Sequence, residues 1–84
     1  MKRPDKFCVI INHDKDLSAK VQNKLFSMGY TWYSRSTLIK EYDIYLINCN
    51  GNGQLTYLYN DNLTPSFRTI FAEQFLCPGI FEEL

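Results

Sequence analysis

Residues 14–32, which read DKDLSAKVQNKLFSMGYTW, determine the fold more than any other stretch of this chain. When residues are placed at intervals of about 100°, four apolar side chains fall within about 80° of one another, which is typical of an amphipathic helix. These are Leu17, Val21, Leu25 and Met28. Asp14 or Asp16 can accept the first free backbone N–H groups as the N-cap, and Gly29 can adopt the left-handed conformation that ends a helix. The stretch therefore predicts a helix that packs this apolar stripe onto a sheet.

Segments with strand character lie on both sides of this helix. Residues 6–12 carry a run of apolar β-formers, and three later segments alternate between two faces. These segments are residues 30–35, 42–49 and 54–59. Between the last two lies Asn50-Gly51-Asn52-Gly53, and Asn-Gly pairs tolerate the positive φ of tight hairpin turns. The order β-α-β-β-β predicts an α+β fold, an antiparallel sheet with one helix packed on one face.

The chain after residue 59 predicts shorter elements. Asn60–Pro65 is typical of a polar turn, Phe67–Ile70 of a short edge strand, and Ala72–Leu76 of a single helical turn. One helix covers one face of the sheet, so the other face must meet solvent, the C-terminal tail or a second copy of the chain. We expect the function to lie on that other face.

Composition places the chain among small globular domains. It has 84 residues, 45% of them apolar and 15% aromatic, and we treat residues 1–84 as one domain with a polar lead-in over 1–6 and a tail over 77–84. Nine basic and nine acidic side chains cancel, which argues against a nucleic-acid binder that relies on a strongly basic surface. The longest apolar run, Phe7–Ile11, is too short to cross a bilayer, and we expect no secretory signal at the amino terminus. We therefore expect a cytoplasmic protein with no membrane partner.

Catalytic and metal-binding patterns are scarce. The single histidine, His13, has no serine or cysteine partner nearby in the sequence, and we interpret it as a solvated loop residue. Asp14-Lys15-Asp16 lacks the later ligands of a calcium loop, and Asn50–Gly53 lacks the G-x-G-x-x-G spacing of a dinucleotide loop. The three cysteines are an odd number without close pairs, which indicates reduced thiols. We expect no enzyme, no metal and no cofactor.

Aromatic and basic side chains concentrate in residues 30–35. Such side chains stack on bases, bind phosphates and form the hot spots of protein interfaces. Strand alternation places Tyr30 and Trp32 on one face, which we expect to be the core, and Tyr33 and Arg35 on the other. The last two residues are therefore candidates for a binding surface.

Further binding candidates come from the sheet and the helix. Tyr45 and Tyr57 add phenols to the same sheet, and Arg68 adds a second guanidinium. Phe26 falls opposite the apolar stripe of the helix, so it is either buried under the C-terminal tail or part of a contact surface. Gln22 lies one turn before Phe26, and core packing requires neither residue.

Residues 21–32 contain the pattern V-Q-x-x-L-F-x-x-G-Y-x-W, which resembles one found in small, mostly uncharacterised proteins of tailed bacteriophages. In those proteins a strand precedes the pattern, and a hairpin and an acidic-x-Phe-Leu element follow it. Residues 73–76, EQFL, are similar to that last element. The resemblance implies an accessory protein that redirects or disarms the bacterial host and acts in the cytoplasm of the infected cell.

The leading hypothesis is a phage host-takeover or counter-defence protein that inhibits a host protein by stoichiometric binding, without catalysis, and that can form a homodimer. Its contact residues would come from the aromatic, basic and helix candidates described above. These are Tyr33, Arg35, Tyr45, Tyr57, Arg68, Gln22 and Phe26.

Two alternatives belong to other functional classes. One is a sponge that sequesters a nucleotide signalling molecule in a pocket lined by arginines and a tyrosine. That pocket would consist of Tyr33, Arg35 and Arg68. The other is a small nucleic-acid-binding regulator that uses Lys2, Arg3, Lys6 and the region of Trp32, which the zero net charge disfavours.

Overall fold

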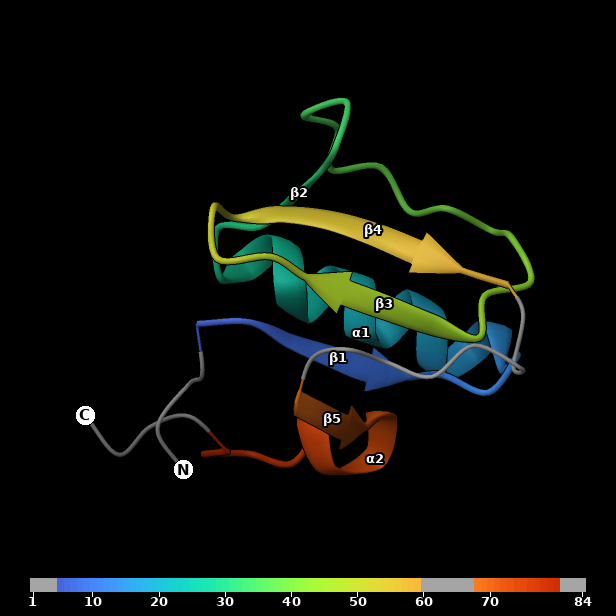
Figure 1. Cartoon of the computed structure of the whole chain (residues 1–84). Coiled ribbons are helices and arrows are strands. Elements are labelled where there is room, and N and C mark those ends of the chain that lie inside the picture. Colours follow the sequence, from blue (N-terminus) through green and yellow to red (C-terminus); the bar gives the residue numbers. More distant parts are fainter. Residues whose placement is uncertain (1–4, 60–67, 81–84) are drawn as a thin grey trace.

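The computed structural model describes residues 5–59 and 68–80, and it shows a five-stranded sheet with one long and one short helix (Figure 1). In chain order the elements are β1 (Phe7–Ile10), α1 (Lys15–Ser27), β2 (Thr31–Trp32), β3 (Leu46–Cys49), β4 (Gln54–Leu58), β5 (Arg68–Phe71) and α2 (Ala72–Phe75). The predicted α+β class, with one main helix packed on a sheet, is confirmed. Within the described ranges, neither helix has the length and apolar character needed to cross a membrane.

Helix α1 begins and ends where its sequence predicts. The carboxylate of Asp14 accepts the backbone N–H of Leu17 at 3.1 Å, which satisfies one of the free donors of the first turn. At the other end, the N–H of Gly29 bonds the carbonyl of Phe26 at 3.0 Å, and the N–H of Tyr30 bonds the carbonyl of the residue before Phe26 at 3.1 Å. This pair of bonds forms a Schellman motif, and Gly29 takes the left-handed φ of 99° that the motif requires.

The strand order of the sheet is β2-β4-β3-β1-β5. In Figure 1, β3 runs opposite to both of its neighbours, β1 and β4, and these central pairs are antiparallel. The outer pairs, β2 with β4 and β5 with β1, are parallel, so the sheet is mixed rather than antiparallel throughout. The chain reaches β2 from β1 through α1, and a crossover helix of this kind delivers the second strand parallel to the first.

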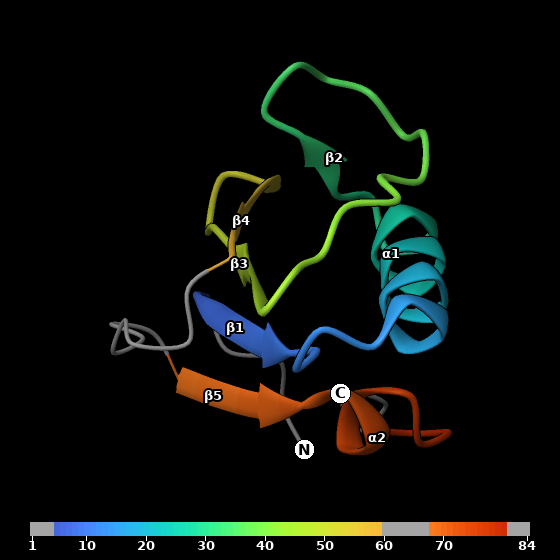
Figure 2. The ribbon, with the colours of Figure 1, turned by 90° about the vertical axis from the view of Figure 1, so that its right-hand side faces the viewer.

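The main core lies between α1 and the sheet (Figure 2). Val21 and Leu25 of α1 are fully buried, and the short α2 packs beside α1 and contributes Phe75. The ring of Phe7 lies 6.1 Å from that of Tyr30 and 6.0 Å from that of Phe75. Large rings of this kind supply much of the buried area that a short chain needs.

The opposite face of the sheet is buried at its centre. Cys8 and Ile10 of β1 pack with Leu46 of β3 on this face, and Tyr45 and Leu58 pack against them. Cys8 and Leu46 are both 0% exposed. Contrary to the expectation from the sequence, the centre of this face is therefore not available for binding.

The Asn50–Gly53 segment forms the predicted hairpin turn between β3 and β4. The N–H of Gly53 bonds the carbonyl of Asn50 at 3.0 Å, and the N–H of Asn50 bonds the carbonyl of Gln54 at 3.0 Å. Gly53 has a φ of 86°, as the last residue of a three-residue hairpin loop requires. The carbonyl of Gly53 also accepts the N–H of Thr31 at 3.0 Å, which ties β2 to the hairpin.

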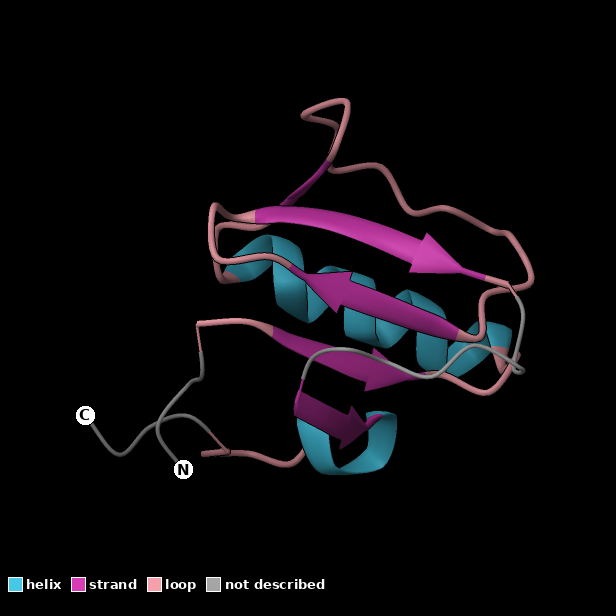
Figure 3. Cartoon of the chain, viewed as in Figure 1, coloured by secondary structure: helices cyan, strands magenta, loops and turns pink. Residues whose placement is uncertain are grey.

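Strand β2 is shorter than the predicted strand, which runs on to Arg35. The N–H of Arg35 bonds the carbonyl of Trp32 at 2.6 Å, and the N–H of Trp32 bonds the carbonyl of Ser36 at 2.9 Å. These turn hydrogen bonds lead the chain away from the sheet after Trp32, and it rejoins the sheet at Leu46 rather than at Tyr42. Residues 33–45 therefore form one long connection, which we call the 33–45 loop (Figure 3).

The last two elements agree with the sequence. β5 is the predicted edge strand, and α2 is the predicted helical turn. The expected turn over Asn60–Pro65, the basic residues Lys2 and Arg3, and the tail beyond residue 80 lie outside the described residues.

Candidate functional site

Five aromatic rings form a continuous row from α1 across β2 and β4 to the 33–45 loop. Edge-to-face contacts join Phe26 to Trp32 at 6.4 Å and Trp32 to Tyr57 at 5.6 Å between ring centroids. Tyr57 in turn lies 5.7 Å from Tyr42 and 5.2 Å from Tyr59. We call these rings the aromatic row. Trp32 is 1% exposed, whereas Tyr42 and Tyr59 are 49% and 56% exposed, so the row leads from the core to the surface.

A lysine of the 33–45 loop lies against the aromatic row. The Nζ atom of Lys40 is 5.4 Å from the ring centroid of Trp32 and 5.6 Å from that of Tyr42. The electron-rich faces of the rings attract the ammonium group. This contact places a positive charge beside the surface end of the row.

The backbone of Lys40 is held by a buried amide of α1. The side chain of Gln22 is 0% exposed; its Nε2 donates to the carbonyl of Lys40 at 2.9 Å, and its Oε1 accepts the N–H of Lys40 at 2.7 Å. Nε2 also lies 2.9 Å from the hydroxyl of Ser18, to which it donates. Gln22 is therefore fully used inside the protein, and a partner cannot contact it directly. Its sequence interpretation as a contact residue is corrected to that of a positioning residue.

A second anchor holds the middle of the same loop. The indole Nε1 of Trp32 donates to the carbonyl of Leu38 at 3.1 Å. The side chains of Tyr33 and Leu38 nevertheless extend outward, with 75% and 77% of their surface exposed. The loop thus presents large apolar side chains from a backbone that is attached to the core at two points.

A groove lies between the start of this loop and β4. It has a volume of about 310 Å³. Its walls combine the end of β2, the 33–45 loop and three consecutive residues of β4. The lining residues are Trp32, Tyr33, Ser34, Lys40, Leu55, Thr56 and Tyr57.

The phenol of Tyr57 has an altered acidity. Its hydroxyl lies 3.2 Å from that of Tyr59. This hydrogen bond, together with desolvation and the charges of Tyr59 and Tyr42, raises the pKa of Tyr57 to about 12. Like an ordinary phenol, Tyr57 is protonated at neutral pH, and the raised pKa extends this state to more alkaline pH.

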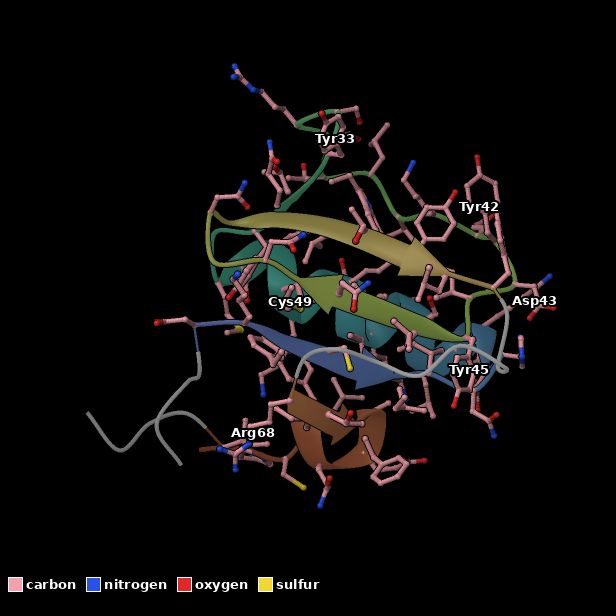
Figure 4. The ribbon with its side chains drawn as sticks, viewed as in Figure 1. Tyr33, Tyr42, Asp43, Tyr45, Cys49 and Arg68 are labelled. Atoms are coloured by element: carbon pink, nitrogen blue, oxygen red, sulfur yellow. The ribbon has the colours of Figure 1, made fainter. Side chains whose placement is uncertain are left out.

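The structure places the predicted binding residues in separate parts of the fold, as the positions of Tyr33, Tyr45 and Arg68 show (Figure 4). Tyr33 and Arg35 lie in the loop beside β2, at one edge of the sheet, and both are exposed. Arg68 lies on β5, at the opposite edge. The predicted pocket of Tyr33, Arg35 and Arg68 therefore does not form. Tyr57 belongs to the aromatic row, and Tyr45 packs on the other face of the sheet, beside Leu46.

Two further expectations are changed by the packing of the aromatic row. Phe26 is partly buried against Trp32, so it belongs to the aromatic row and is not a free contact residue. Trp32 is 1% exposed and cannot stack on a base, which removes the aromatic part of the predicted nucleic-acid surface.

His13 has a partner that the sequence did not indicate. Its Nδ1 lies 2.9 Å from Oδ1 of Asp43, and its ring lies 5.7 Å from that of Tyr45. Asn12 and His13 have φ values of 58° and 65°, so the chain makes a tight left-handed turn before α1. The side chains of His13 and Asp43 are 36% and 67% exposed, so this is a surface pair that contributes little to stability. The interpretation of His13 as a merely solvated residue was incomplete, because no local pattern signals a partner 30 positions away.

Cys8, the cysteine nearest to His13 in the sequence, is not an activated nucleophile. Burial raises the pKa of the Cys8 thiol, although a hydrogen bond to Thr69 lowers it in part. Cys8 therefore stays a thiol at neutral pH, and a thiol is a poor nucleophile. Cys8 and Cys49 are buried, whereas Cys77 is exposed. Across residues 5–59 and 68–80, no group of three His, Cys, Asp or Glu side chains is arranged to hold a metal ion.

The fold and this surface define a small α+β domain with an aromatic groove at one edge of its sheet. No protein-family model and no curated protein matches the chain, and no solved structure matches it. Its function is accordingly inferred from the groove and the 33–45 loop.

Proposed function

We propose that this chain is a non-catalytic binding domain that occupies a partner protein stoichiometrically through the 33–45 loop and the exposed end of the aromatic row. One observation carries this proposal. Tyr33, Leu38 and Tyr42 are 75%, 77% and 49% exposed, on a loop whose backbone is held by the buried Gln22 and Trp32. Large exposed apolar side chains are typical of contact surfaces, and a preorganised backbone loses little conformational entropy on binding.

The resemblance of residues 21–32 to tailed-phage proteins supports a bacterial host protein as the partner. In this proposal the chain is a phage accessory protein of host takeover or counter-defence, and it acts in the cytoplasm of the infected cell. The interaction would block the partner by occupying its surface.

The test is quantitative capture from a bacterial lysate with the immobilised full chain. The double variant Tyr33→Ser/Leu38→Ser removes two exposed side chains without touching the core. The matched control, Lys20→Ser/Asn23→Ser, changes two exposed residues of α1. A host protein that is recovered in equal amounts by the wild-type and control chains, and lost with the loop variant, supports the proposal. If the three chains recover the same proteins, the loop is not the contact surface.

We also propose a homodimer that leaves the groove free. β5 is the far edge of the sheet, and its last residue, Phe71, is 56% exposed. Size-exclusion chromatography with light scattering should give twice the chain mass of 9.9 kDa for the wild type and a lower mass for Phe71→Ser. A wild-type monomer at micromolar concentrations contradicts the dimer, but not the binding of a partner.

A nucleotide sponge is the second candidate function, and the groove is the observation that favours it. Its volume of about 310 Å³ lies at the lower end of small-molecule sites, and Lys40 supplies a cation next to aromatic rings. A ligand present at a hundred times its Kd stabilises a protein by about 2.7 kcal/mol, so thermal shift with a panel of signalling nucleotides is a sensitive test. No shift with any nucleotide would eliminate this candidate.

A further inference from the structure

Strand β4 is longer than the strand that covers its outer edge. β2 pairs with β4 through only two residue pairs, Thr31 with Gln54 and Trp32 with Leu55, whereas β4 continues to Leu58 (Figure 1). Among the described strands, none pairs with this side of β4 beyond Leu55. Within residues 5–59 and 68–80, the second half of β4 is therefore an open sheet edge, a ready template for another strand.

Backbone alternation determines which groups face this open edge. In an antiparallel pair, successive residues of a strand turn their N–H and C=O groups alternately toward the partner strand and away from it. Gln54 accepts a hydrogen bond from Asn50 across the hairpin, and Leu58 accepts one from Tyr45, so the even-numbered residues of β4 bond to β3. The N–H and C=O of Tyr57 consequently face the open edge.

The groove follows the same edge. Leu55, Thr56 and Tyr57 all line it. Consecutive side chains of a strand point to opposite faces of the sheet, so three in succession border one groove only when it runs along the strand's edge. An occupant of this groove therefore meets the backbone of β4 and the side chains around it.

The charge of the groove indicates which kind of partner segment it can bind. Among the described residues that line it, Lys40 alone is charged, and its ammonium group lies over the rings of Trp32 and Tyr42. An acidic side chain complements this charge. Apolar side chains complement the aromatic wall that Tyr33 and Tyr57 provide.

We propose, on the basis of the binding function above, that the partner protein enters this groove as an extended acidic segment and adds a short strand to β4 beside Tyr57. Main-chain hydrogen bonds to Tyr57 hold the segment, and an acidic side chain lies next to Lys40. A second copy of this chain is a poor occupant, because symmetric pairing of two β4 edges places the two Lys40 cations in one interface.

The experiment uses peptides selected from a random display library against the immobilised full chain. We expect the selected peptides to combine acidic and apolar residues. Lys40→Gln should weaken the best peptide by about tenfold or more, and Lys20→Gln, a control at an exposed site on α1, should leave its affinity unchanged. N-methylation, which removes one peptide N–H at a time, should weaken binding at alternate residues only, as strand pairing requires.

Hydrogen exchange of the isotopically labelled full chain tests whether the peptide pairs with the open edge of β4. Bound peptide should slow exchange of the Tyr57 amide by about tenfold or more and leave the Thr56 amide, which already faces β3, unchanged. Binding without the alternate N-methyl pattern, or without protection of Tyr57, overturns strand addition and leaves the loop-mediated function intact. Selection of no peptide that depends on Lys40 also overturns it, and so does protection of Tyr57 by self-association. The capture experiment with the loop variant tests the underlying function separately.

Discussion

Gln22 illustrates how one buried amide can hold a surface loop in place. Its side chain lies in α1, yet both of its polar atoms bond the backbone of Lys40, 18 positions away. A polar side chain on a surface helix usually points into solvent, whereas a buried one must have its hydrogen bonds satisfied. Here the amide of Gln22 and the backbone of Lys40 satisfy each other's hydrogen bonds. The conformation of the 33–45 loop depends on these bonds.

Replacing Gln22 with leucine should destabilise the protein and release the loop. Gln22→Leu leaves the N–H and C=O of Lys40 without their partner, and an unsatisfied buried group costs about 1–3 kcal/mol. Urea denaturation should therefore show a loss of about 2 kcal/mol. Asn23→Leu, at the exposed neighbouring position, should change the free energy of unfolding by no more than about 0.5 kcal/mol. Equal effects of the two substitutions would contradict the anchoring role of Gln22.

Tyr57 should make stability depend on pH in the alkaline range. Its pKa rises from 10 in the unfolded chain to about 12 in the fold, so the fold favours the protonated phenol. This contribution is complete below pH 10 and disappears as the pH rises through about 12. Ultraviolet titration of the phenols should show one tyrosine ionising late, and Tyr59→Phe should return it toward its ordinary value. A titration curve that Tyr59→Phe leaves unchanged would show that the hydroxyl pair does not cause the shift.

At the scale of elements, the ends of α1 and the β3–β4 hairpin are governed by short-range rules. Asp14 caps the helix through a bond to a residue three positions later, and the Schellman motif ends it within one turn. The hairpin loop closes over three residues with Gly53 in the left-handed region. Each feature depends on the φ preference or hydrogen-bonding group of a particular residue type.

The left-handed conformation of Gly29 at the end of α1 predicts that different substitutions there destabilise the fold to different extents. Gly29 has a φ of 99°, and a Cβ atom there would meet no atom within 4 Å, so any cost of substitution comes from the backbone. Gly29→Ala should destabilise the fold by about 1–2 kcal/mol, the penalty of the left-handed region for ordinary residues. Gly29→Asn should cost less, because asparagine tolerates that region. Thermal unfolding of the three chains checks the order, and an alanine variant as stable as the wild type would refute it.

At the scale of the whole molecule, the sheet is organised around β1 and β3. Both strands have neighbours on either side and carry fully buried residues, whereas β2 touches the sheet at two residue pairs only. The groove and the open half of β4 lie at this weakly covered edge. A binding surface at the edge with the fewest strand pairs leaves the centre of the sheet undisturbed.

Native-state hydrogen exchange should show that the centre of the sheet is more stable than its β2 edge. The amides of Val9 and Ile47, in the central β1–β3 pair, should exchange only through global unfolding. The amide of Thr31, which bonds Gly53 at the edge, should exchange through local opening and respond little to denaturant. If Thr31 exchanges as slowly as Val9, the edge unfolds together with the rest of the protein.

The sequence predicted the features whose causes lie within a few residues. The apolar stripe, the cap and the terminator of α1 were correct because helical periodicity, carboxylate capping and the conformational freedom of glycine act locally. The hairpin at Asn50–Gly53 was correct for the same reason. The aromatic residues around Trp32 were recognised as a candidate site, because rings of this kind are used both in cores and in interfaces.

Features that depend on contacts between segments far apart in the sequence were determined only by the tertiary structure. Nothing near β2 or β5 indicates that each pairs in parallel with its neighbour, because strand partners are selected by contacts across the whole chain. The bonds from Gln22 to Lys40 and from His13 to Asp43 likewise join segments with no shared local pattern. The groove likewise has walls from segments far apart in the sequence, because the 33–45 loop lies beside β4 where β2 has already ended.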